Sequence, residues 1–146
     1  MKPCLIIGST VCDVIINLPA IPLSAQDTNI YSQTLQIGGC AYNVVSILHH
    51  LSLPYTFLSP VGTGVYGEFV ERELNKTGIT TMIRTDQENG CCYCLVEDSG
   101  ERTFLSYHGA EYTFQKAWTD TLNLSAYGYI YACGIDMEDK DASLIV

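Results

Sequence analysis

Residues 38–43, GGCAYN, lie where a predicted strand gives way to a predicted helix. Residues 30–37 alternate in part between apolar and polar side chains, which predicts a half-exposed strand. Residues 44–51 carry apolar side chains at helical spacing and are followed by Pro54, so a helix is predicted that ends before this proline. The two glycines therefore lie at a strand-to-helix junction, where they allow the backbone to approach a ligand closely.

Asp13 is the acidic residue that we associate with this junction. It comes five residues after Gly8, just past the end of the first predicted strand, and in an open α/β sheet ligands bind at that edge. Asn43 would present its carboxamide from the first turn of the helix. A carboxylate accepts hydroxyl hydrogen bonds and a carboxamide both donates and accepts them, so the pair suits a polyhydroxylated ligand. Taken alone, the glycines and Asn43 are also explained by a turn and a helix start.

Short apolar runs alternate with predicted helices along the 146 residues, a length that suits one domain. Residues 4–8, 55–61 and 129–133 are predicted as strands buried on both faces, which indicates a parallel α/β core. Residues 12–37 and 90–107 contain half-polar strands that do not belong to that sheet. We expect them to form a small second sheet that projects from the core as a flap.

Residues Gly62 to Gly67, GTGVYG, match the dinucleotide-binding pattern G-x-G-x-x-G between a strand and a helix. In that pattern the glycines let a pyrophosphate approach backbone N–H groups. Here, however, the pattern lies in the second strand–helix unit, and residues 80–84 contain no acidic residue at the end of a strand. These features favour a tight structural turn, and a dinucleotide-binding domain is the alternative.

The composition limits the partners and the location. Seven Lys and Arg against 16 Asp and Glu give a net charge of −9 at pH 7. Such a surface repels phosphate backbones and anionic lipid, so neither nucleic acid nor a membrane is expected as a partner. No apolar run reaches the ~20 residues of a membrane span, and the N-terminus has no signal-peptide cleavage site, which predicts a cytoplasmic protein.

The seven cysteines are an odd number at irregular spacing, mostly within apolar runs, where a thiol packs as a small hydrophobe. Cys91, Cys92 and Cys94 form one cluster, whereas a structural zinc site usually needs two paired clusters. His49 and His50 are adjacent on a predicted helix and therefore point apart. We predict no metal site.

Five motifs occur in order along the chain. They are IIGSTVCD at residues 6–13, GGCAYN at 38–43, PVGTGVYG at 60–67, GERTF at 100–104 and HGA at 108–110. In this order they resemble the N-terminal half of a ribokinase-like carbohydrate kinase of the phosphofructokinase-B (PfkB) type, from about residue 4 to the end of the chain. The second and third motifs are similar to the first signature of that family.

The resemblance implies a central, mostly parallel α/β sheet flanked by helices, with a small β lid over the substrate. It implies transfer of the γ-phosphoryl group of ATP, with Mg²⁺, to a hydroxyl of a sugar or nucleoside. By position, Asp13 and Asn43 would bind substrate hydroxyls, Gly38 and Gly39 would bring the backbone close, and Cys92 would lie on a lid strand. Many relatives dimerise through the lid, so a homodimer is a further expectation.

The resemblance also implies a part that this chain lacks. The family's general base is an aspartate in a Gly-Ala-Gly-Asp turn that also cradles the phosphate, and no such turn occurs here. Glu111 stands where the family usually has an asparagine. We therefore expect residues 1–146 to be the substrate-binding side of a longer kinase, without its ATP-binding half and inactive alone. A non-catalytic fragment that dimerises through an exposed lid edge is a third alternative.

Overall fold

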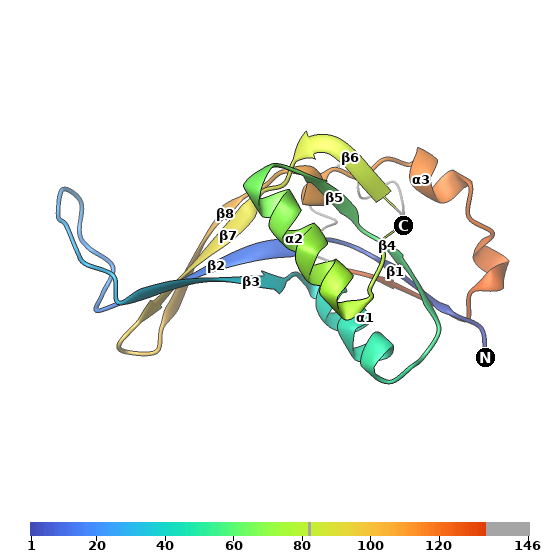
Figure 1. The fold of residues 1–146 in the computed structure, drawn as a ribbon, viewed down its shortest axis with the longest axis horizontal. Coiled ribbons are helices and arrows are strands. Elements are labelled where there is room, and N and C mark those ends of the chain that lie inside the picture. Colours follow the sequence, from blue (N-terminus) through green and yellow to red (C-terminus); the bar gives the residue numbers. More distant parts are fainter. Residues whose placement is uncertain (82, 134–146) are drawn as a thin grey trace.

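The computed structural model of the chain describes residues 1–81 and 83–133. Three strands form a parallel sheet in the order β4-β1-β9 (Figure 1): β1 (Cys4–Ile7), β4 (Tyr55–Leu58) and β9 (Tyr129–Ala132). The central strand β1 is apolar at every position, and Leu5 and Ile6 are both fully buried although they point to opposite faces. The predicted parallel α/β core is thereby confirmed.

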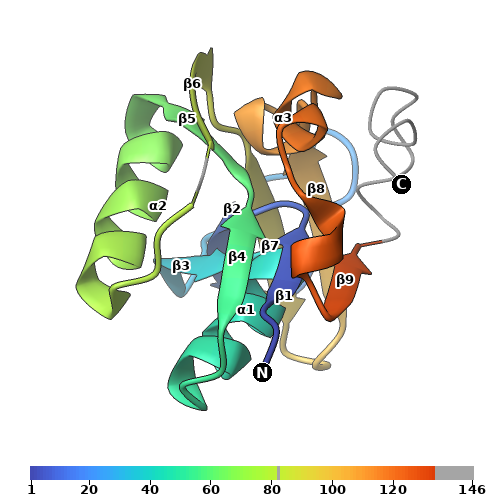
Figure 2. The ribbon, with the colours of Figure 1, turned by 90° about the vertical axis from the view of Figure 1, so that its right-hand side faces the viewer.

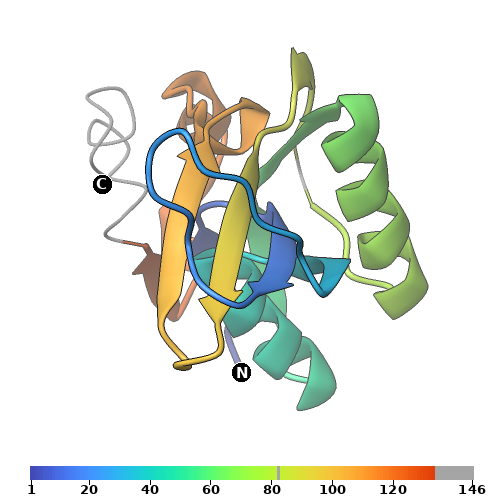
Figure 3. The same cartoon turned by 90° about the vertical axis from the view of Figure 1, so that its left-hand side faces the viewer.

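A second sheet has the strand order β3-β2-β7-β8: β2 (Val11–Leu18), β3 (Ser32–Gly38), β7 (Cys91–Glu97) and β8 (Arg102–Tyr107). Its central strands β2 and β7 are parallel, and each pairs antiparallel with its outer neighbour. Figure 1 shows these strands extending away from the three-stranded sheet. The two half-polar segments, residues 12–37 and 90–107, thus lie together in a separate sheet. In Figure 3 the β7–β8 hairpin and the loop after β2 face the viewer.

A third, two-stranded parallel sheet consists of β5 (Pro60–Thr63) and β6 (Ile83–Glu88). The prediction of one strand over residues 55–61 is wrong, because the chain leaves the first sheet at Ser59. This buried serine makes a 2.8 Å hydroxyl–hydroxyl hydrogen bond with Thr10, and its N–H donates to Thr81 Oγ1 at 3.2 Å. Side-chain partners at Ser59 therefore replace sheet pairing and redirect the chain.

The two longer helices are α1 (Cys40–His50) and α2 (Gly64–Thr77), which match the predicted helical segments. Gly78 ends α2 with a left-handed φ of 74°, the conformation that glycine adopts without strain. The remaining short helices are η1 (Ala110–Tyr112), α3 (Ala117–Asp120) and η2 (Leu124–Ala126). None of the described helices is long and apolar enough to cross a membrane. The apolar residues within 138–146 also predict the start of a helix, and this segment lies outside the described residues.

The core has two parts because β1 alternates its side chains between two faces. Ile6 packs on the larger cluster, with Val45 from α1 and Leu74 from α2. Leu5 and Ile7 pack on a smaller cluster with Phe114, which lies between η1 and α3. Figure 2 shows α2 on one flank of the β4-β1-β9 sheet and α3 on the other. The sheet is thus covered on both faces, as its apolar strands require.

Replacing Phe57 tests the larger cluster. Phe57 is 2% exposed on β4, so Phe57→Ala should lower the free energy of unfolding by about 3–5 kcal/mol, through lost burial and the cavity left behind. The matched control is Phe104→Ala, because Phe104 is 59% exposed on β8 and its loss should cost less than about 1 kcal/mol. Urea denaturation measures both values, and similar losses in the two variants would contradict this description of the core.

Candidate functional site

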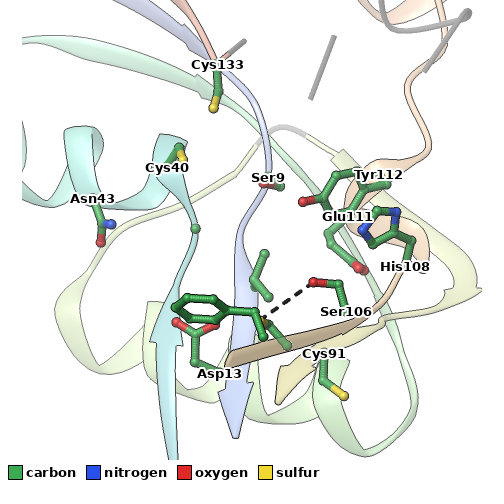
Figure 4. A pocket seen from close by; sticks show the side chains of 14 residues that line it. Ser9, Asp13, Cys40, Asn43, Cys91, Ser106, His108, Glu111, Tyr112 and Cys133 are labelled. Carbon is green, nitrogen blue, oxygen red and sulfur yellow. Dashed lines mark hydrogen bonds between the residues drawn. The ribbon is translucent and has the colours of Figure 1, made fainter. Parts of the chain in front are cut away.

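A cavity of about 440 Å³ lies where the second sheet meets the start of α1 (Figure 4). Its volume is within the range of small-molecule sites. Residues of β2, β7 and β8 line it from the second sheet, and residues of α1 and η1 contribute the rest of the described lining together with Ser9, Gly39, His108 and Cys133. Fourteen of the described residues line it.

The predicted residues Asp13 and Asn43 share this cavity, although they come from different elements. Asp13 follows β1, as the sequence indicated, and lies inside β2, opposite Gln36 on β3 and Cys92 on β7. Asn43 lies in the first turn of α1, where its N–H donates to the carbonyl of Gly39 at 3.0 Å. The structure therefore brings a carboxylate and a carboxamide to one hollow. Gly39 and Cys92 line the same hollow.

A side chain at position 38 would displace the carboxyl group of Asp13, which occupies the space that its Cβ would fill. Gly38 pairs with Val11 in the sheet, and this pairing sets the position of its backbone relative to Asp13. This glycine is not among the residues that line the cavity. It acts on the site through Asp13, whose carboxyl group lies against it.

Gly39 is required for two separate reasons. Its φ is +98°, a backbone conformation that L side chains rarely adopt. A Cβ at this position would also lie 2.6 Å from the carbonyl oxygen of Ser9 and 3.1 Å from the backbone N of Val11. The start of α1 is thereby held against the segment that leads into β2. The close approach fixes Asn43, one turn along α1, relative to Asp13.

Burial determines the protonation of the acidic groups near the cavity. Burial raises the pKa of the Asp13 carboxyl above its ordinary value. The pKa of the Cys92 thiol is also raised, chiefly by burial, although the hydroxyl of Ser106 donates to its sulfur at 3.7 Å and opposes this shift. Burial raises the pKa of neighbouring Cys12 to about 12. Cys12 and Cys92 are therefore neutral thiols at pH 7. Of these three acidic groups, Asp13 is the one that carries a negative charge.

The cavity lining also contains residues that were not predicted as site residues from the sequence. His108 and Tyr112 stack with ring centroids 3.7 Å apart and an interplanar angle of 6°. Ser106 and Phe104 face the same cavity from β8, where they pair with Cys92 and Cys94 of β7. Residues 98–101, DSGE, are typical of a tight hairpin turn between two strands. This signal could have found the pairing of Ser106 and Phe104 with β7, because a tight turn fixes the register of the two strands beside it.

The glycines of the G-x-G-x-x-G segment do not line this cavity. The N–H of Gly62 donates to the side-chain oxygen of Asn89, and a Cβ at Gly67 would collide with the carbonyl of Gly62. Close packing of backbone on backbone thus accounts for both glycines. These contacts favour the interpretation of the segment as a structural turn.

The cavity suits a neutral, hydroxyl-rich molecule better than a nucleotide polyphosphate. Its lining includes the acidic residues Asp13 and Glu111, and within the described part of the chain no Lys or Arg lines it to balance phosphate charge. Nor do three His, Cys, Asp or Glu side chains converge, among residues 1–81 and 83–133, in a way that could hold a metal ion. The described residues therefore do not fit Mg²⁺ and ATP.

Comparison with known proteins gives a consistent result. The family model described as pfkB family carbohydrate kinase matches residues 1–145. YegV of Escherichia coli (strain K12), an uncharacterized sugar kinase, is 31% identical over 143 residues, which make up 97% of this chain and 44% of YegV. The solved ribokinase from Giardia lamblia superposes with a TM-score of 0.78 at 21% identity, over 90% of this chain and 44% of that one. The solved fructokinase from Xylella fastidiosa superposes with a TM-score of 0.77 at 20% identity, over 99% of this chain and 45% of that one. The chain thus spans less than half the length of these relatives.

The raised pKa of Asp13 predicts that its charge destabilises the fold. An acid whose pKa is higher in the folded state than in the unfolded state lowers the free energy of unfolding when the pH is above both pKa values, because its ionised form is less stable in the folded protein. This cost disappears when the pH falls below the pKa of the unfolded state, about 3.9. Asp13→Asn should therefore raise the melting temperature at pH 7 by up to about 3 °C. The gain should vanish as the pH falls toward about 4.

Calorimetry across this pH range measures the effect, and Asp86→Asn serves as the control because Asp86 is exposed on β6. A melting temperature at pH 7 that is lower in Asp13→Asn than in the unchanged protein would contradict the assigned cost of burial.

Proposed function

The chain belongs to the pfkB family of carbohydrate kinases, and from this membership we propose that the intact protein transfers the γ-phosphoryl group of ATP to a hydroxyl group of a sugar or nucleoside. The cavity between β2, α1 and the β7–β8 hairpin is its substrate-binding side. The observation that carries the proposal is the convergence of Asp13 and Asn43 on one cavity beside the backbone of Gly39.

The chemistry of these groups matches an alcohol substrate. The Asp13 carboxylate accepts hydrogen bonds from substrate hydroxyls, and the Asn43 carboxamide both accepts and donates them. Asp13 projects from β2 and Asn43 from the first turn of α1, so both groups start from ordered backbone when they orient the substrate. Cys92 and Phe104 add apolar surface for the carbon skeleton.

We assign the second sheet the role of a lid over the substrate. Its β7–β8 hairpin places Cys92, Phe104 and Ser106 on the wall opposite Asn43. A lid excludes water, which would otherwise compete with the alcohol for the phosphoryl group. The outer strand β8 also exposes Leu105 (56%) and Tyr107 (61%) at the sheet edge, which supports pairing with a second copy of the chain.

The donor nucleotide, Mg²⁺ and the general base are proposed to lie outside the described residues. Mg²⁺–ATP would supply the phosphoryl group and the neutralisation of its charge. This proposal follows from the lining of the cavity, which does not fit a polyphosphate, and from relatives of which the chain spans less than half. The described residues then bind and orient the alcohol, and the chemical step takes place at its exposed hydroxyl.

Removing the Asp13 carboxylate tests the substrate-binding role. In the intact protein, Asp13→Ala should raise KM for the alcohol by about 5- to 150-fold, the equivalent of ~1–3 kcal/mol for a lost hydrogen bond to a charged group. KM for ATP should stay within about twofold, because no part of the ATP site is assigned to Asp13. A coupled assay with a panel of sugars and nucleosides identifies the substrate and gives both constants. Asp86→Ala is the control, and an unchanged KM for the alcohol in Asp13→Ala would contradict the role.

The 146-residue chain alone should not transfer a phosphoryl group, because neither base nor phosphate cradle is assigned to it. Consumption of ATP by this chain with the sugar and nucleoside panel measures this directly. Turnover that depends on the alcohol would overturn the placement of the chemistry in the remainder of the family fold.

A further inference from the structure

The β7–β8 hairpin is joined to the rest of the molecule at two glycines that touch each other. Gly90 directly precedes β7, and Gly109 follows two residues after the end of β8. A Cβ at Gly90 would lie 2.8 Å from the backbone N of Gly109, and one at Gly109 would lie 2.7 Å from the carbonyl carbon of Asn89. The two ends of the hairpin thus meet main chain to main chain, with no room for a side chain between them.

The carboxylate of Glu111 lies at this crossing and contacts both ends. Its Oε2 accepts a hydrogen bond from the N–H of Gly90 at 2.7 Å, and its Oε1 accepts one from the N–H of Gly109 at 2.9 Å. Glu111 is only 1% exposed. A buried carboxylate is costly unless its oxygens are paired, and hydrogen bonds to a charged acceptor are stronger than neutral ones.

The hairpin ends held by Glu111 carry a large part of one wall of the cavity. Cys91 and Cys92 follow Gly90 directly along the chain, and Ser106 and His108 come shortly before Gly109. All four residues line the cavity (Figure 4). Any change in the angle at which the hairpin leaves the crossing therefore moves this wall relative to Asn43 on α1.

We propose that Glu111 is a positioning residue of the substrate site. Its carboxylate holds the two ends of the β7–β8 hairpin together and thereby sets the separation between the hairpin wall and the wall formed by α1. This inference rests on the proposed function, because the molecule between the two walls is taken to be the alcohol substrate. Glu111 acts through the hairpin.

The carboxylate is better suited to this position than the amide of the same shape. Two backbone N–H groups point at the two oxygens of Glu111, so the position needs two acceptors. In Glu111→Gln one oxygen is replaced by an NH₂ group, which is itself a donor and faces an N–H. The variant keeps the volume of the side chain, loses one of the two hydrogen bonds and leaves a buried donor unpaired.

The test compares Glu111→Gln with Glu101→Gln in the intact protein. Glu101 is exposed at the far end of the same hairpin, so its substitution makes the same chemical change away from the crossing. Glu111→Gln should raise KM for the alcohol about tenfold or more, leave KM for ATP within about twofold, and speed hydrogen exchange of the Gly90 and Gly109 amides at least about tenfold. Glu101→Gln should change none of these. A uniform loss of activity at unchanged KM would indicate a purely structural role and overturn the proposal.

Asp13→Ala, measured beside these variants, separates this inference from the proposed function. If Asp13→Ala raises KM for the alcohol and Glu111→Gln does not, the positioning role is wrong and the substrate site stands. If neither variant changes KM, both are wrong. Should Glu111→Gln fail to fold, hydrogen exchange in the unchanged protein decides: slow exchange of both glycine amides, as in the β7–β8 ladder, supports the role, and exchange as fast as in an unstructured peptide overturns it.

Discussion

At Gly38 and Gly39 the backbone passes so close to β2 and to the segment before it that a side chain at either position would meet atoms already there. The space that a side chain at position 38 would take belongs to the Asp13 carboxyl, and position 39 lies against the carbonyl of Ser9. Because α1 begins immediately after this contact, Asn43 is carried to the same cavity as Asp13. The placement of Asn43 relative to Asp13 thus depends on glycines, which have no side chain, at positions 38 and 39.

The two acidic residues that line the cavity differ in a way that follows from their surroundings. Both oxygens of Glu111 are used by backbone N–H groups, and the side chain is almost fully buried. The pKa of Asp13 is raised by burial, and its charge opposes folding in the absence of a ligand. A carboxylate that is costly to the empty protein gains hydrogen bonds when hydroxyl groups reach it. Glu111 therefore belongs to the framework of the site, whereas Asp13 is suited to contact the substrate.

Local sequence patterns predicted the parts of this protein that local physics governs. The strand-to-helix junction at residues 38–43 and the end of the following helix before Pro54 each depend on a few neighbouring residues. The break at Ser59 could not be predicted, because it depends on hydrogen bonds with Thr10 and Thr81, which are distant in the sequence. The role of Glu111 was hidden for the same reason, since its partner Gly90 lies 21 residues away. The sequence associated Gly38 with the site, whereas in the structure this glycine lies outside the cavity lining and contacts the Asp13 carboxyl group, which no local pattern indicates.

The central claim is that the carboxylate of Asp13 and the carboxamide of Asn43 hold the same substrate molecule. The most direct measurement is a crystal structure of the intact protein with the alcohol that it phosphorylates. We predict substrate hydroxyls within about 3.2 Å of both side chains, with the β7–β8 hairpin in contact with the same molecule. A substrate bound elsewhere, with Asp13 and Asn43 in contact only with water, would contradict the claim.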